Sequence, residues 1–305
     1  MAQIAAHNDP KARSRNASPP KRSNVKMFLA VILILIGVGV LVYPVVATQW
    51  NNWQQQQAAD EYAKLEKAAP PEVLDTAWED ALRYNLERTG NSGFTDAWRA
   101  IADETSPAYQ QYLQYLSQLS DTDAMGQIMI PSIKSKLPIY HGTGPHALDR
   151  GVGHLFGTDL PIGGDNRHSV LSAHTGIQTA TLWDNLINVK KGEVFYVAVS
   201  GHKLKYQVDM IKIVEPDHLD DLGRENGRDF VTLVTCTPYG INSHRLLVRG
   251  HRVPMDKDES KVFEASQIVW QWWMWALIAA AIIIILTLLA WLMKGTRRAG
   301  RHTAL

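Results

Sequence analysis

The chain has 305 residues, 46% of them hydrophobic, and a formal net charge of +1. Six Lys or Arg residues precede position 27 and four follow position 293, while one acid lies in the first of these tails. The middle therefore carries 31 − 10 = 21 basic and 30 − 1 = 29 acidic residues. This acidic balance argues against nucleic acid as a partner. The single cysteine excludes an internal disulfide.

Two segments are apolar and long enough to cross a bilayer, residues 27–47 and 268–293. Four tryptophans lie at the first end of the second segment and Trp291 lies near its last end, as interfacial anchors do. The basic tails, residues 1–26 and 294–305, are predicted to stay in the cytoplasm because positive charge remains inside. We therefore expect a two-pass membrane protein whose middle lies on the extracellular side. A cleaved signal peptide is the alternative reading of the first segment.

Residues 48–124 are predicted to form an extracytoplasmic helical region. Residues 54–69 resemble a helix that stops at two prolines, and residues 72–88 repeat apolar side chains at helical spacing. Thr95 or Asp96 is placed to cap a short helix that runs through Glu104. Ser106 followed by Pro107 marks the start of another helix. The apolar face of this last helix is expected to pack on the rest of the domain.

From residue 125 to residue 254 the pattern changes to short strands separated by Gly and Pro. The candidate strands are residues 127–130, 137–140, 169–173, 194–199, 204–214, 230–235 and 245–253. Residues 179–186 form the one predicted helical insertion. Many short strands of this kind indicate a mainly β domain, either a closed barrel or a sandwich. Residues 255–267 are predicted to link it to the second apolar segment.

Cys236 lies where the predicted strand 230–235 ends, because Pro238 and Gly240 cannot continue a central strand. A thiol at the open end of a rigid strand suits a nucleophile that a substrate must reach. A buried structural cysteine is the alternative. Arg245 opens the next apolar run, so antiparallel pairing of the two strands would place its side chain beside the thiol.

His174 occupies a similar position, after the predicted strand 169–173 and before Gly176. An imidazole can exchange a proton with a thiol near neutral pH, and a guanidinium can stabilise an oxyanion. His174, Cys236 and Arg245 would thus suffice for attack on a carboxamide, although sequence spacing does not establish that they meet.

Other polar residues predict no metal or cofactor. The four histidines His141, His146, His154 and His168 fit no zinc spacing and are interpreted as polar loop residues. The acidic stretch at residues 217–221 lacks an EF-hand loop and is interpreted as a solvated turn.

The run Thr-Leu-Val-Thr-Cys at residues 232–236, with His174 before it and Arg245 after it, resembles the sortase signature. Residues 137–142, 151–155 and 236–252 resemble class C, the pilin-polymerising sortases. The resemblance implies a closed eight-stranded β-barrel and a Cys-His-Arg transpeptidase acting outside the cell. It implies cleavage of an LPxTG-like sorting signal after Thr and a thioester on Cys236. His174 would be the acid/base, Arg245 would stabilise the oxyanion, and a pilin lysine would accept the acyl group.

Class C sortases usually carry a lid with an Asp-Pro-aromatic motif, and the nearest match is Asp96-Ala97-Trp98. We hypothesise that Asp96 meets Arg245 and that Trp98 covers Cys236; without the proline the lid backbone is less restricted. A helix start with a core tryptophan is the alternative.

Three alternatives to pilus polymerisation remain open from sequence. They are a wall-anchoring sortase that uses a peptidoglycan-precursor amine, a thiol peptidase that uses water, and a non-enzymatic pilus assembly scaffold.

Overall fold

The computed structural model describes residues 22–88, 104–218, 220–265 and 268–301. It divides into two compact units, which are described separately: Met1–Tyr43 with Ala276–Leu305, and Pro44–Trp275. The first unit contains the apolar part of α1 (Arg22–Ala68) and most of α6 (Trp272–Arg301). Both helices are long and apolar enough to cross a membrane, as the sequence predicts.

Helix α1 is continuous from the apolar segment into the region predicted as a separate helix at residues 54–69. Pro44 lies inside the helix, at the boundary between the two units. Beyond it, α1 is anchored to the second unit by polar side chains. Asn52 Nδ2 donates to Thr181 Oγ1 at 2.9 Å, and the Thr181 N–H donates back to Asn52 Oδ1 at 2.9 Å. Thr48 Oγ1 donates to the carbonyl oxygen of Gln178 at 3.2 Å.

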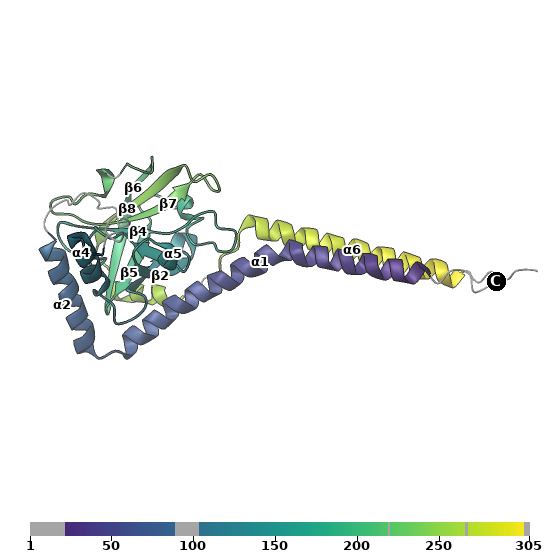
Figure 1. Cartoon of the computed structure of the whole chain (residues 1–305), viewed down its shortest axis with the longest axis horizontal. Helices are drawn as coiled ribbons and strands as arrows, with labels where there is room; N and C mark the ends of the chain where they lie inside the picture. Colours follow the sequence, from purple (N-terminus) through teal and green to yellow (C-terminus); the bar gives the residue numbers. More distant parts are fainter. Residues whose placement is uncertain (1–21, 89–103, 219, 266–267, 302–305) are drawn as a thin grey trace, which may run out of the picture. The chain divides into compact units, whose positions relative to one another are not determined.

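Eight strands form a closed barrel in the order β1-β2-β3-β4-β7-β8-β6-β5, so the closed-barrel prediction is confirmed (Figure 1). Pairing of β1 with β5 completes the closure. The strands are β1 (Gly126–Ile130), β2 (Ser135–His141), β3 (Val152–His154), β4 (Arg167–Ser172), β5 (Val194–Val199), β6 (His202–Val214), β7 (Asp229–Thr237) and β8 (His244–Val253).

Strand β3 is absent from the seven strands predicted by residue pattern. It has three residues, and Gly153 interrupts any alternation of apolar and polar side chains. A Cβ on Gly153 would lie 2.3 Å from the carbonyl oxygen of Gly142, so only glycine permits this close approach. The close approach of β3 to the Gly142 backbone requires a glycine at position 153. That glycine removes the alternation by which a strand is recognised in sequence.

Two helices on the barrel, α2 (Pro71–Glu87) and α4 (Pro107–Leu116), agree with the predicted helices (Figure 1). The Ser106 side chain caps α4 by accepting a hydrogen bond from the Tyr109 N–H at 3.1 Å. Tyr115 is fully buried in the main core, where its hydroxyl accepts from the Gly142 N–H at 2.8 Å. Helix α4 therefore packs on the barrel, as its apolar face predicts.

The prediction of a helix at residues 179–186 is wrong. The segment forms turns that lead into the 3-10 helix η2 (Leu186–Asn188). Side chains of α1 bond to backbone groups of Thr179 and Thr181, and of Gln178 just before the segment, and Leu182 has a φ of +39°. Hydrogen bonds to α1 side chains therefore override the local helix propensity of this segment.

Four shorter elements complete the second unit. Helix α5 (Pro145–Leu148) precedes β3, while η1 (Pro131–Ile133) and η3 (Asp220–Leu222) are 3-10 turns. Within residues 255–267, η4 (Lys257–Glu264) begins with a capping box on Asp256, and Phe263 is buried against Tyr196. This segment is thus docked on the barrel as well as connecting it to α6.

Candidate active site

Cys236 lies near the end of β7, directly opposite Arg245 on β8. The β7–β8 ladder continues through Thr237, two residues beyond the predicted end of the strand. The thiol is free and half-buried, so it combines a rigid backbone with access from solvent. Pairing in the ladder fixes Arg245 as its neighbour, as the sequence predicted.

His174 approaches Cys236 from the other side of β7. Strand β4 is parallel to β7 up to the pair Ser172 and Val234. The register is held one residue further, because Thr235 Oγ1 donates to the Ala173 carbonyl oxygen at 2.7 Å. The same register places His174 level with Cys236. Since β4, β7 and β8 are consecutive in the barrel, the three predicted residues lie at one end of three adjacent strands.

The backbone around His174 is held by the segment that returns toward the barrel. The Trp183 N–H donates to the His174 carbonyl oxygen at 3.2 Å, and Trp183 is fully buried. The Asp184 carboxylate accepts from the Gly176 N–H at 2.8 Å and from Thr175 Oγ1 at 3.4 Å. Burial raises the pKa of Asp184 to about 6. These contacts fix the loop that carries the imidazole.

The His174 side chain is 36% exposed, and its Nε2 lies 4.0 Å from Asp149 Oδ1 at the end of α5. Asp149 is 67% exposed, which makes this a solvent-facing pair. The imidazole is thus accessible to a substrate and has a carboxylate beside it.

The Arg245 guanidinium is oriented by main-chain oxygens. It donates to the carbonyl oxygens of Asn242 at 3.3 Å and His244 at 3.2 Å. Both hydrogen-bond partners of the guanidinium are main-chain oxygens, and within residues 22–88, 104–218, 220–265 and 268–301 no carboxylate forms an ion pair with it. Its positive charge remains available to a substrate oxygen or to a carboxylate elsewhere in the chain.

The two predicted lid residues, Asp96 and Trp98, lie outside the described residues. The interpretation of the histidines as loop residues is wrong for all four, because His141 ends β2, His146 lies in α5, and the other two lie on strands. His154 lies on β3 and is fully buried, which lowers its pKa to about 3. His168 on β4 is 2% exposed and contacts Thr232 Oγ1 at 2.7 Å. Over the described part of the chain, no cluster of His, Cys, Asp or Glu has the arrangement of a metal site.

Sequence reasoning missed two aspartates: Asp149, which lies beside the His174 imidazole, and Asp184, which holds the loop after His174. Asp149 lies at the end of α5 and Asp184 in a turn, so no periodic pattern marks either residue. The contact between Asp184 and Gly176 spans eight positions, and only the fold of the intervening turn reveals it.

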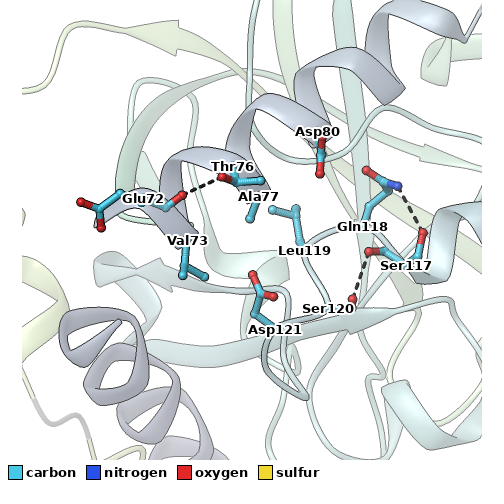
Figure 2. Close-up of a pocket in the computed structure, with 10 residues that line it drawn as sticks. All are labelled: Glu72, Val73, Thr76, Ala77, Asp80, Ser117, Gln118, Leu119, Ser120 and Asp121. Atoms are coloured by element: carbon cyan, nitrogen blue, oxygen red, sulfur yellow. Dashed lines mark hydrogen bonds between the residues drawn. The ribbon is translucent and has the colours of Figure 1, made fainter. Parts of the chain in front are cut away.

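The candidate active site does not coincide with the larger of the two cavities described here. A cavity of about 460 Å³ lies between α2 and residues 117–121, where Figure 2 shows Glu72, Asp80 and Asp121 among its lining residues. Neither His174, Cys236 nor Arg245 lines it. A smaller cavity of about 330 Å³ is lined in part by Asp149, the neighbour of His174.

A free thiol at a barrel rim, level with an imidazole on one side and opposite a guanidinium on the other, is the arrangement of a cysteine-dependent acyl-transfer enzyme. Comparison with known proteins identifies the family. Residues 128–253 match the family described as Sortase domain. The chain belongs to the sortase family of cysteine transpeptidases.

The crystal structure of sortase C-1 from Actinomyces oris is 49% identical, with a TM-score of 0.56, and the match covers 60% of this chain and 99% of that one. A Streptococcus pneumoniae sortase C structure is 37% identical, with a TM-score of 0.57, and the match covers 65% and 97%. These neighbours are sortase C structures, in agreement with the class C resemblance. A curated relative, sortase A of Streptococcus agalactiae, is 31% identical over 116 residues, which are 37% of this chain and 47% of that protein. The chain thus spans about half the length of this curated relative.

Proposed function

We propose that this protein is a membrane-anchored transpeptidase that joins a sorting signal to a lysine amine of a pilin subunit. The observation that carries the proposal is the placement of Cys236 between His174 and Arg245 at the ends of β4, β7 and β8. The described spans of α1 and α6 support anchoring in a membrane. With both basic tails in the cytoplasm, the barrel lies on the extracellular side.

In the first half-reaction, the Cys236 sulfur attacks the carbonyl carbon of the Thr residue in an LPxTG-like signal. The Arg245 guanidinium stabilises the negative charge on the carbonyl oxygen, and His174 donates a proton to the departing glycyl amine. The C–N bond breaks and a thioester remains on Cys236. The second half-reaction transfers this acyl group to an amine, and His174 accepts the proton that the amine loses.

Hydroxylamine capture tests the first half-reaction. The full chain in detergent micelles is incubated with an LPxTG-like peptide and hydroxylamine, and hydroxamate is measured. We expect hydroxamate and a thioester adduct by mass spectrometry from the natural chain, and neither from Cys236→Ala. The exposed substitution Gln57→Leu serves as a control that keeps the thiol. A natural chain that yields neither product would contradict the proposal.

Two comparisons address the alternative functions. A peptidase that uses water would release free acid, and added amine would not divert its product. If the protein were a non-enzymatic scaffold, the Cys236→Ala variant would support pilus assembly as well as the natural chain does. The remaining choice, between a pilin lysine and a cell-wall amine, depends on the acceptor side of the site.

A further inference from the structure

The outward face of α1 changes from apolar to polar within the second unit. The side of this helix that faces the barrel includes Thr48 and Asn52, both of them buried. On the opposite side, three exposed apolar residues follow one another at helical spacing: Val46, Trp50 and Trp53, which are 61%, 57% and 51% exposed. The next residues on that side are polar and exposed, namely Gln57, Glu61 and Lys64. The apolar stripe therefore ends within one helical turn after Trp53.

A second group of exposed tryptophans lies where the chain enters α6. Trp270, Trp272 and Trp275 are 44%, 79% and 59% exposed, and the ring centroids of Trp270 and Trp275 are 5.0 Å apart. A hydrogen bond joins this group to α1, because Gln49 Nε2 donates to the Val269 carbonyl oxygen at 2.8 Å. Each partner of this bond directly precedes a tryptophan of its own group. We call the five exposed tryptophans of the second unit the tryptophan collar: Trp50, Trp53, Trp270, Trp272 and Trp275.

The chemistry of the collar fits a lipid interface. Exposed apolar patches of this kind mark binding surfaces. An indole combines a large apolar ring with one N–H donor, so it is favoured at the boundary between lipid headgroups and acyl chains. Both helices continue from the collar into apolar runs that are long enough to cross a membrane. A bound peptide or a second copy of the chain would have no such continuity with the apolar runs.

The turn of α1 that carries the collar also holds the loop after His174. Asn52, which lies between the two collar residues of α1, exchanges two hydrogen bonds of 2.9 Å with Thr181. Two residues further on, the Trp183 N–H donates to the His174 carbonyl oxygen at 3.2 Å. Hydrogen bonds thus connect the collar to the residue that carries the candidate catalytic imidazole.

We propose that the tryptophan collar binds the headgroup boundary of the bilayer and thereby fixes the turn of α1 that holds the His174 loop. The bilayer then supports the candidate site as well as anchoring the chain. The boundary lies at Trp50 and Trp53, beyond residue 47, where the first apolar segment ends in sequence. Lipid binding by the collar does not depend on the chemistry of Cys236, so it is tested separately from the proposed function.

Collision measurements on nitroxide labels test where the collar lies. The full chain is reconstituted in vesicles of phosphatidylcholine and phosphatidylglycerol, with Cys236 replaced by Ala so that each variant has one thiol. Labels are introduced one at a time by the substitutions Val46→Cys, Trp50→Cys, Trp272→Cys and Lys64→Cys. Oxygen concentrates among the acyl chains and a nickel chelate stays in water, so the ratio of their collision rates with the label reports its depth.

We expect the ratio of oxygen to nickel collisions at positions 50 and 272 to be severalfold above the ratio at Lys64 and below that at Val46. A ratio at position 50 equal to that at Lys64 would place the collar in water and overturn the proposal. Low collision rates with both reagents would also overturn it, because a protein surface, such as a second copy of the chain, would then cover the collar.

Amide hydrogen exchange in the same vesicles tests the connection to the loop. Replacing both Trp50 and Trp53 by Ala removes the α1 half of the collar and keeps a strong helix former at each position. We expect the Thr181 and Trp183 amides to exchange severalfold faster than in the natural chain. Leu65→Ala, at an exposed apolar residue of the same helix beyond the collar, is the matched control and should leave both rates unchanged. Equal exchange in the natural and doubly substituted chains would overturn the support of this loop by the collar.

Discussion

Two aspartates, the buried Asp159 and the half-buried Asp184, have different partners. Asp159 is 1% exposed and lies among three arginines. Arg224 engages both of its carboxylate oxygens, while Arg167 and Arg88 lie 3.7 and 3.9 Å from Oδ1. Its Oδ2 also accepts from the His168 N–H at 2.9 Å. This carboxylate connects β4 to the end of α2.

Asp184 has no arginine among the described residues and accepts only from the Gly176 N–H and the Thr175 hydroxyl. Desolvation therefore dominates, and the pKa of Asp184 rises to about 6. The comparison shows how surroundings assign different roles to the same side chain. Cations make Asp159 part of the structural framework, whereas Asp184 holds the loop that carries a candidate catalytic residue.

Removing Asp159 should produce the largest loss of stability. Asp159→Ala leaves buried arginines without their counter-charge, so we expect the free energy of unfolding to fall by about 3–5 kcal/mol. Pulse proteolysis in urea, with the full chain in detergent micelles, measures the change. Asp165→Ala, a substitution at an exposed position nearby, should change it by about 0.5 kcal/mol or less. A loss below about 1 kcal/mol for Asp159→Ala would mean that the arginine cluster does not anchor α2.

Removing Asp184 should affect activity more than stability. Asp184→Ala leaves the Gly176 N–H without its acceptor and lets the loop of His174 move. We expect hydroxamate formation to fall about 10- to 100-fold, because small displacements of a catalytic group cost large factors in rate. Asp184→Asn keeps an acceptor oxygen and should retain most of the rate. Equal rates for Asp184→Ala and the natural chain would show that this contact does not position the imidazole.

Asp184 also predicts a pH dependence of stability. Its pKa is raised from 3.8 to about 6, so folding disfavours the ionised form. The natural chain should therefore lose stability relative to Asp184→Asn as the pH rises from 3.8 to about 6. We expect a difference of about 1–2 kcal/mol after allowing for partial exposure of the carboxylate. Pulse proteolysis of both proteins across this range measures it, and a difference that grows in the opposite direction would contradict the raised pKa.

The barrel was predictable where local pattern and tertiary structure agree. The long apolar runs of β7 and β8 predicted both strands from sequence. Their antiparallel pairing places Arg245 opposite Cys236. The position of His174 required more, because β4 is parallel to β7 and its register depends on contacts such as that between Thr235 and Ala173. Sequence spacing did not predict that His174 lies next to Cys236, and only the family resemblance implied it.

The predictions failed where long-range contacts override local preference. Strand β3 depends on a glycine that admits another backbone, and the turns at residues 178–182 depend on side chains of α1 more than 120 positions away. Buried His154 resembles a loop residue in sequence, yet it contacts the Tyr115 hydroxyl at 3.0 Å. Asp149 and Asp184 belong to the same group, because only the folded chain brings them to His174.

The smallest expected effect concerns a third aspartate, Asp96, whose pairing with Arg245 remains a prediction. Arg245 is half-buried and bonds to main-chain oxygens, so an added ion pair should contribute only about 0–1 kcal/mol to stability. Its effect should instead be on access to the thiol. Replacing Asp96 by Ala and Trp98 by Gly should speed labelling of Cys236 by a methanethiosulfonate reagent severalfold, measured by mass spectrometry over time.

A double-mutant cycle with Arg245→Ala separates the two lid residues. If Asp96 holds the lid through the guanidinium, Asp96→Ala should speed labelling in the natural background and have no further effect once Arg245 is removed. Trp98→Gly should still act in both backgrounds, because its proposed role is to cover the sulfur. Unchanged labelling in all variants would count against a lid.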